Sequence, residues 1–168
     1  MKLSFIIITN GKNVEKTKIQ VRSILRQSLT NPEIIICGNI GTFSTWKDPC
    51  IKLVDDKVNA DFGFLGGLRN SACAASTGDY LIISDDDMMF SLDWYENFLE
   101  YREDFDILTP CVKVPDGTRF WDHCCYMSPI RGHIVLNPEE NDDHLYMSGG
   151  QSWIMKRSVW EKVRWDQS

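Results

Sequence analysis

The sequence has no long apolar run and no segment at its start that is typical of a secretory signal. No run approaches the roughly 20 apolar residues that are needed to span a bilayer. The apolar stretch after Met1-Lys2 ends at Ile8, and it lacks both the length and the small-residue cleavage site of a signal peptide. These absences predict a cytoplasmic protein without a transmembrane segment, and they leave peripheral contact with a membrane open.

The sequence also lacks a CxxC pair, although it contains six cysteines. Closely spaced cysteine pairs are the usual signal of structural zinc, so no such site is expected, and the thiols are predicted to be reduced and mostly buried. The adjacent residues His123, Cys124 and Cys125 would give poor tetrahedral geometry around a metal. They are therefore predicted to have a structural role.

Basic residues are in the minority, because 18 Lys and Arg face 24 Asp and Glu, which gives a formal net charge of -6. Nucleic-acid binding depends on clustered Lys and Arg that neutralise phosphates, so nucleic acid is excluded as the main partner. A phosphorylated metabolite is still compatible with this charge, because a divalent cation can bridge two negatively charged partners.

What the sequence does contain is an alternation of strands and helices. Continuous apolar, β-rich runs are typical of strands that are buried on both faces of a sheet. Strands are predicted over 3–8, 34–37, 51–54 and 80–83, and helices over 13–27, over 65–76 and from Ser91 onward with Leu92, Tyr95, Phe98 and Leu99 as the apolar face. This order predicts an α/β fold with a mainly parallel sheet flanked by helices.

The pattern becomes less regular after Asp106. Short β segments are predicted over 107–109, 112–114, 119–121 and 153–155, a polar loop over 137–144, and a last helix over 158–163. The sequence shows no internal repeat, low-complexity segment or linker, so residues 1–168 are predicted to form a single domain.

Three adjacent carboxylates, Asp85, Asp86 and Asp87, come directly after the predicted strand 80–83. Ligands of open α/β sheets bind beyond the carboxyl ends of the strands. Side chains alternate at a period of two, so Asp85 and Asp87 can point the same way, and a cation would offset their repulsion. Hard oxygen ligands suit Mg²⁺ or Mn²⁺, which bind through one or two carboxylates plus substrate phosphates. The alternative is a solvated acidic turn that leads into the next helix.

Several blocks of the sequence, spread over nearly its whole length, occur in the order found in one enzyme family. They are Thr9-Asn10, SILRQS at 23–28, GLRN at 67–70, GDYLIISDDD at 78–87, Gly149-Gly150, IMKR at 154–157 and Trp165-Asp166. Together they resemble the family 2 glycosyltransferases, which are inverting enzymes with a DxD motif and the GT-A fold. The resemblance implies a GT-A-like, Rossmann-like sandwich with a nucleotide-binding part at about 1–105 and an acceptor-side part at about 106–168.

The resemblance also implies roles for individual residues. The nucleotide-sugar site would be formed by Thr9, Asn39, Arg69, Asp85 and Asp86. Mn²⁺ or Mg²⁺ would be bound by Asp87, with Asp85 completing the metal shell or contacting the ribose. Arg69 would face the diphosphate through bidentate, charge-assisted bonds, whereas its alternative role is a surface ion pair. Asn70 could simply brace the adjacent turn, and His144 could be a third metal ligand or face solvent.

The implied reaction is transfer of a sugar, with inversion, from a nucleoside diphosphate sugar to a hydroxyl of a saccharide or other acceptor.

The sequence departs from the family pattern at two places that affect this function. Asn39 stands where family members commonly carry an Asp that reads the nucleobase, so the base is left open. The family's Glu-Asp pair, which contains the general base, usually lies several residues beyond the position of Asp166, and this sequence ends at Ser168. The resemblance therefore predicts a chain truncated before that segment, with no catalytic base identified.

Three other functions were considered for a sequence with these features. The absent Glu-Asp segment favours a catalytically incomplete module that binds nucleotide sugar without transferring it. A phosphatase of the haloacid dehalogenase type also places DxD after a buried strand, but near the N-terminus and followed by Thr or Val, whereas Met88 follows here. A nucleotidyltransferase would need a Gly- and Arg-rich loop after Ile8, which the sequence lacks.

Overall fold

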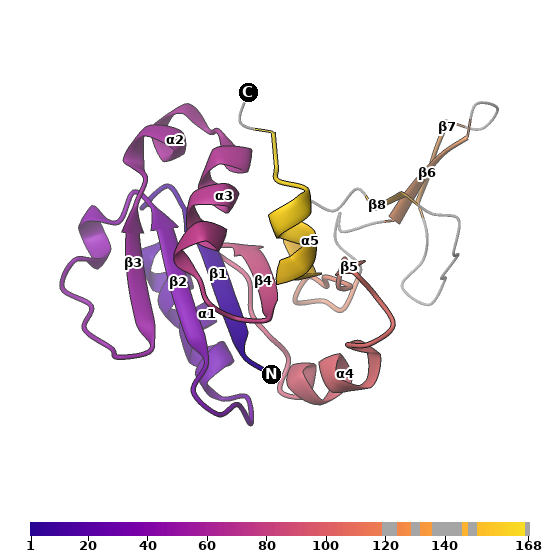
Figure 1. Cartoon of the computed structure of the whole chain (residues 1–168), viewed down its shortest axis with the longest axis horizontal. Coiled ribbons are helices and arrows are strands. Elements are labelled where there is room, and N and C mark those ends of the chain that lie inside the picture. The colour runs from indigo at the N-terminus through magenta and orange to yellow at the C-terminus, as the bar shows by residue number, and fades with distance from the viewer. Residues whose placement is uncertain (119–123, 129–131, 136–145, 148–150, 167–168) are drawn as a thin grey trace.

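The computed structural model describes residues 1–118, 124–128, 132–135, 146–147 and 151–166. Its main feature is a six-stranded sheet in the order β3-β2-β1-β4-β9-β5 (Figure 1). The strands are β1 (Leu3–Thr9), β2 (Glu33–Gly38), β3 (Ile51–Asp55), β4 (Tyr80–Asp85), β5 (Ile107–Leu108) and β9 (Ser152–Lys156). Strands β1 to β4 pair in parallel, and β9 is antiparallel to both β4 and β5. The predicted α/β fold with a mainly parallel sheet is confirmed.

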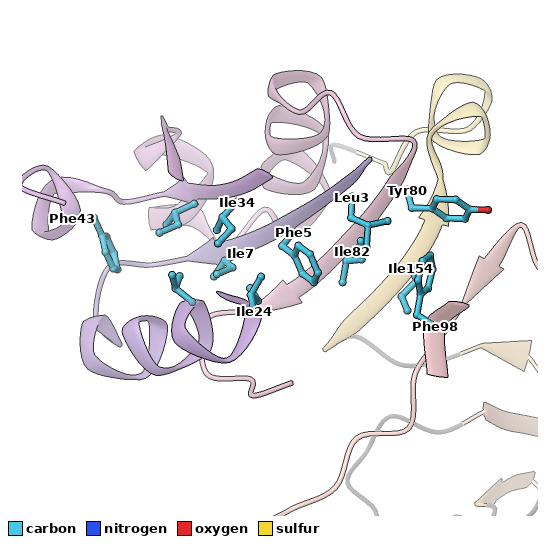
Figure 2. Close-up of a cluster of buried hydrophobic side chains, with 12 residues drawn as sticks. Leu3, Phe5, Ile7, Ile24, Ile34, Phe43, Tyr80, Ile82, Phe98 and Ile154 are labelled. Carbon is cyan, nitrogen blue, oxygen red and sulfur yellow. The ribbon is translucent and has the colours of Figure 1, made fainter. Parts of the chain in front are cut away.

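Helices cover both faces of this sheet, which is why its central strands are mainly apolar. The main helices are α1 (Val14–Leu25), α3 (Leu65–Ala75), α4 (Trp94–Tyr101) and α5 (Arg157–Lys162). Alternate residues of β1 face opposite sides. Phe5 and Ile7 pack in a cluster with residues of α1 and α4 (Figure 2), and Ile6 and Ile8 pack in a second cluster with residues of α3 and α5. Every residue of β1 is consequently buried.

Helix α4 corrects one sequence prediction. The helix begins at Trp94, three residues after the predicted start at Ser91, because residues 91–93 form a turn in which the amide of Trp94 donates to the carbonyl of Ser91. Leu92 is 78% exposed and is not part of the apolar face assigned to it. Phe98 does face the core, where its ring stacks on that of Trp94 at 5.5 Å between centroids.

A short helix, α2 (Lys57–Phe62), was not predicted from the sequence, and it follows the short 3₁₀ turn η1 (Gly41–Phe43) and strand β3. Asp56 caps α2, since its carboxylate accepts from the Asn59 amide at 3.4 Å and from the Asn59 side chain at 2.9 Å. Gly63 ends it in the left-handed conformation, with φ 72°, which glycine adopts without steric cost. Asp56 and Gly63 are the local sequence signals of α2, because this helix is too short to show the periodic spacing of apolar residues that predicts longer helices.

The second half of the chain is only partly described. The predicted strand 153–155 and helix 158–163 are confirmed as β9 and α5, and a separate three-stranded sheet has the order β7-β6-β8. Its strands are β6 (Cys124–Ser128), β7 (Gly132–Val135) and β8 (Tyr146–Met147). Segment 112–114 forms no regular strand and leads into a turn in which Val114 and Thr118 are hydrogen bonded. The predictions for 119–121, His123, 137–144, His144 and Gly149-Gly150 lie outside the described residues.

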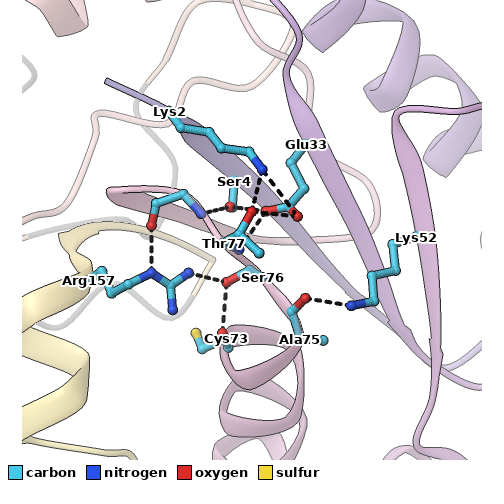
Figure 3. A network of polar contacts seen from close by, with 10 residues as sticks. Lys2, Ser4, Glu33, Lys52, Cys73, Ala75, Ser76, Thr77 and Arg157 are labelled. Carbon is cyan, nitrogen blue, oxygen red and sulfur yellow. Dashed lines mark hydrogen bonds and ion pairs between the residues drawn. The ribbon is translucent and has the colours of Figure 1, made fainter.

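Polar side chains close the sheet at the amino ends of its parallel strands (Figure 3). Glu33 accepts hydrogen bonds from Ser4 Oγ at 2.5 Å and from the Thr77 amide at 2.7 Å. Arg157 donates to the Gly78 carbonyl and to Ser76 Oγ, both at 2.7 Å, and so attaches the start of α5 to the turn between α3 and β4. These hydrogen bonds join the starts of β1, β2, β4 and α5 at this end of the sheet.

Across the described part of the chain, no helix has the length and apolar character required to cross a membrane.

Candidate functional site

The carboxyl ends of β1, β2 and β4 bring most of the predicted site residues to one edge of the sheet. Ile8 of β1 is in register with Asp85, the last residue of β4, and Thr9 is in register with Gly38 at the end of β2. The amide of Asn39 donates to the carbonyl of Thr9 at 3.1 Å. Residues that are far apart in the sequence therefore meet where open α/β sheets bind their ligands.

The three adjacent aspartates have different surroundings. Asp86 is only 7% exposed, and its carboxylate accepts from Thr9 Oγ1 at 2.5 Å and from Asn13 Nδ2 at 2.8 Å. It thus joins the end of β4 to the end of β1 and to the residue that precedes α1. Asp85 is half-buried, and Asp87 is exposed. The prediction that Asp86 contacts the nucleotide sugar stays a prediction, and its observed contacts are with the protein.

Asp85 is held in an environment that opposes its negative charge. The pKa of its carboxyl group is raised to about 6, mainly because burial disfavours the charged form; the positive charge of Arg69 lowers the pKa, and the negative charges of Asp87 and Asp86 raise it. Arg69 lies on α3 and is itself half-buried, and this burial lowers the pKa of its guanidinium group. A divalent cation would favour the ionised form of Asp85 in the same way as Arg69 does.

This pKa predicts how stability depends on pH when no metal is present. The carboxyl group of an unfolded Asp has a pKa of about 3.9, so between about pH 4 and pH 6 the folded state binds more protons at Asp85 than the unfolded state does. The contribution of Asp85 to stability is therefore lost as the pH rises through this window. We expect Asp85→Asn to be more stabilising at pH 7.5 than at pH 5 by about 1 kcal/mol, after allowance for solvent screening.

The measurement is urea unfolding of the parent protein and of Asp85→Asn in EDTA at both pH values. The attraction of Arg69 is already included in the pKa of about 6, so the change in this difference between pH 5 and pH 7.5 reports the net cost of ionising Asp85 in the folded protein. A difference that is the same at pH 5 and pH 7.5 would show that Asp85 ionises normally in the folded protein.

Asp87 is exposed and makes one ion pair, with Lys16 Nζ at 3.2 Å. Exposed pairs of this kind contribute little to stability, so Asp87 can exchange this partner for a metal at little cost. Because Asp86 is turned toward Thr9 and Asn13, only Asp85 and Asp87 of the triplet remain for a cation. No group of three or more His, Cys, Asp or Glu side chains suited to a metal occurs within the described ranges. Two carboxylates nevertheless fit Mg²⁺ or Mn²⁺, whose remaining ligands are water and phosphate oxygens.

The predicted nucleobase side of the site is built by two loops in close contact. Thr9 is buried, and its hydroxyl also accepts from the Gly11 amide at 2.9 Å. Gly11 has φ 82°, and a Cβ at this position would lie 2.6 Å from the carbonyl oxygen of Asn39. The loop after β1 thus needs glycine to approach the loop after β2, and Thr42 Oγ1 adds a bond to the Gly11 carbonyl at 3.3 Å.

The match of the sequence to a known protein family identifies the kind of protein to which this site belongs. The sequence matches the family model described as glycosyl transferase family 2 over residues 4–163, which is nearly the whole chain. The protein belongs to glycosyltransferase family 2. The family predicted from the sequence blocks is confirmed. No curated protein matches the sequence significantly.

Solved structures show that this family 2 chain has the GT-A fold. The structure of residues 1–349 of TarS from S. aureus, in complex with UDP, is similar with a TM-score of 0.67 and 14% identity, over 96% of this chain and 48% of that 1–349 chain. The mannosyltransferase PcManGT from Pyrobaculum calidifontis, in complex with GDP-Man and Mn²⁺, is similar with a TM-score of 0.60 and 15% identity, over 96% of this chain and 46% of PcManGT. The chain therefore spans about half the length of these neighbours.

Asn70 of this family 2 chain has a structural role that the sequence did not define. Its side chain donates to the Trp165 carbonyl at 2.8 Å and accepts from the Trp165 amide at 3.2 Å and from Trp160 Nε1 at 3.1 Å. The Trp165 ring lies 5.9 Å from the Arg69 guanidinium. Asn70 therefore braces the segment after α5 against α3, rather than the adjacent turn, and no local signal could have identified a partner 95 residues away.

Proposed function

We propose that this protein transfers a sugar from a nucleoside diphosphate sugar to a hydroxyl group of a saccharide or other acceptor, with inversion, and that Mn²⁺ or Mg²⁺ assists. The observation that carries the proposal is the arrangement at the end of β4 in a family 2 chain. There Asp85 is partly desolvated between the positive charge of Arg69 and the negative charge of Asp87. The solvated acidic turn considered as the alternative would not raise the pKa of Asp85.

The roles of the chain's own residues follow from this arrangement. Asp87 and Asp85 would hold the metal, and Arg69 would approach the diphosphate from α3. The metal supplies positive charge that stabilises the nucleoside diphosphate as a leaving group. Thr9 and Asn39 would line the nucleoside side. We infer that Asp86 serves the donor site mainly by holding Thr9 in place.

The neighbouring structures support the donor class. TarS has been solved with UDP-GlcNAc and with UDP, and PcManGT with GDP-Man and Mn²⁺. The donors of these two proteins carry different nucleobases, so they do not indicate which nucleobase this chain binds. Asn39 differs from the Asp that the family commonly carries at this position, and both uridine and guanosine nucleotides therefore belong in the test.

The second candidate is a module that binds nucleotide sugar without transferring it. One observation favours it. The described residues after 118 contain two carboxylates, Glu161 and Asp166, and both are exposed. General-base assistance is typically worth about 10² to 10⁴ in rate. A protein that binds donor but lacks a base at the acceptor would therefore bind normally and turn over slowly.

Calorimetry with UDP and GDP tests the proposal. We expect the affinity of at least one of these nucleotides to be about tenfold higher in Mn²⁺ than in EDTA, since the cation offsets the repulsion between the diphosphate and the aspartates. Equal affinity in both conditions would contradict the metal-assisted site. A transfer assay with UDP-GlcNAc and GDP-mannose then separates the candidates. Metal-dependent binding with transfer of the sugar to an acceptor and release of the nucleoside diphosphate supports the transferase, and binding without transfer supports the module.

A further inference from the structure

Helix α1 and its flanking residues carry a stripe of polar side chains on the side that faces the sheet. The stripe consists of Asn13, Thr17, Gln20, Ser23 and Gln27, whose spacings of three or four residues place them along one side of the helix. Thr17 and Gln20 are fully buried, at 0% exposure. Buried polar groups are costly unless they are hydrogen bonded, so the partners of this stripe indicate its purpose.

The first three residues of the stripe contact the end of β4. Asn13 donates to the Asp86 carboxylate at 2.8 Å. Thr17 Oγ1 lies within hydrogen-bonding distance of two carbonyl oxygens, that of Asn13 at 2.9 Å and that of Asp86 at 3.3 Å. Gln20 Nε2 donates to Ser84 Oγ at 2.7 Å. This part of the stripe therefore holds the two residues that flank Asp85.

The last two residues of the stripe contact the segment that follows Asp87. Ser23 Oγ accepts from the Phe90 amide at 3.0 Å. The Gln27 side chain donates to the Ser91 carbonyl at 2.8 Å and accepts from the Tyr95 amide at 3.1 Å. Ser23 and Gln27 belong to the SILRQS block, whose resemblance to the family was noted without a function.

The segment between β4 and α4 forms no helix or strand over residues 86–93 and contains only short turns. Side chains of α1 supply partners at both ends of it, to Asp86 on one side and to Phe90 and Ser91 on the other. A loop held in this way keeps one conformation only while those partners are present, because each lost bond leaves a buried or half-buried polar group unsatisfied.

We propose that the polar stripe of α1 is a positioning device that holds Asp85, at the end of β4, and the loop bearing Asp87 in their metal-binding conformation. The inference rests on the proposed function. Stripe residues touch the loop and not the ligand, so they are positioning residues. Their loss lowers the fraction of molecules in the binding-competent conformation, and the apparent affinity falls by the same factor.

The test compares two variants that each remove one hydroxyl group from the stripe. Thr17→Val keeps the shape of the side chain and removes its contact with the Asp86 carbonyl. Ser23→Ala removes the acceptor of the Phe90 amide. We expect each to weaken binding of UDP or GDP in the presence of Mn²⁺ about fivefold at 20 °C, which is the effect of one typical net hydrogen bond. Ser23 is 8% exposed, whereas Thr17 is at 0%, and alanine is a good helix former, so Ser23→Ala carries the test if Thr17→Val fails to fold.

Two controls separate positioning from general stability. Thr17→Ser keeps the hydroxyl and is expected to bind within about twofold of the parent protein. Ile24→Val removes one methylene from the core on the same helix, where Ile24 is fully buried, and touches no polar group of the loop. It is expected to lower the melting temperature with no change in affinity.

Unchanged affinity in Thr17→Val and Ser23→Ala, with a fall in melting temperature like that of Ile24→Val, would overturn the inference and leave the proposed function standing. Failure of the parent protein to bind either nucleotide with Mn²⁺ would overturn the proposed function, and the inference with it. Weaker binding in both variants and normal binding in both controls is the result that the inference requires.

Discussion

Replacement of Asp87 by alanine is expected to weaken Mn²⁺-dependent nucleotide binding about 100-fold or more and to leave the thermal melt nearly unchanged. Loss of a residue that only supports a metal ligand already costs about 10- to 100-fold in affinity, and Asp87 is proposed to bind the metal directly. Its side chain is 42% exposed and pairs with an even more exposed Lys16. Such a pair contributes at most about 1 kcal/mol to stability.

The matched control for this prediction is Asp106→Ala. Asp106 forms an ion pair with Lys156 at 3.2 Å, the same distance as the pair between Asp87 and Lys16. It precedes β5, at the edge of the sheet opposite the candidate site. Calorimetry with UDP and GDP in Mn²⁺ should find parent-like affinity in Asp106→Ala. Parent-like affinity in Asp87→Ala as well would show that the metal, if one binds, is held elsewhere.

Replacement of the adjacent Asp86 by alanine, unlike that of Asp87, is expected to lower the free energy of unfolding, by about 3 kcal/mol. Two hydrogen bonds converge on this buried carboxylate, from Thr9 and from Asn13. Hydrogen bonds to charged groups contribute about 1.5–3 kcal/mol each, and contributions at one group are not additive. The variant also leaves the Thr9 hydroxyl buried without this acceptor, so its cost comes from both partners.

Urea unfolding measures this effect, and Asp86→Asn is the matched control. An asparagine retains the shape and one acceptor oxygen, so it can keep one of the two bonds and should lose about half as much stability. A loss below about 0.5 kcal/mol for Asp86→Ala, which is the usual range for an exposed surface residue, would show that the contacts with Thr9 and Asn13 contribute nothing. Together, the Asp87 and Asp86 variants separate ligand binding from support of the fold at neighbouring residues.

Much of the fold followed from local patterns in the sequence. The apolar runs of β1, β2 and β4 indicated strands buried on both faces, because alternate residues such as Phe5 and Ile6 pack against helices on opposite sides. The order of strands and helices then implied a parallel sheet, and a carboxylate triplet at a strand end implied a ligand site. These inferences succeed because strand burial and the direction of the chain are properties of short segments.

The parts that could not be predicted depend on partners far away in the sequence. Strand β9 inserts antiparallel beside β4, which it reaches only after the chain has passed through a second sheet. The predicted start of α4 was wrong because residues 91–93 form a turn, in which the Ser91 carbonyl also accepts from Gln27, 64 residues away. Thr17 lies on the predicted helix 13–27, and the sequence did not reveal that its hydroxyl would lie beside the carbonyl of Asp86.

The sequence by itself therefore determined the α/β class, the family and the location of three carboxylates at the end of a parallel strand. Only the tertiary structure decided what each carboxylate does. Asp85 is desolvated near Arg69, Asp86 is used internally by Thr9 and Asn13, and Asp87 remains exposed. The reason is physical, because the three side chains are chemically identical and adjacent. Their differences come from the helices that the fold places on each face of the sheet, α3 beside Asp85 and α1 beside Asp86.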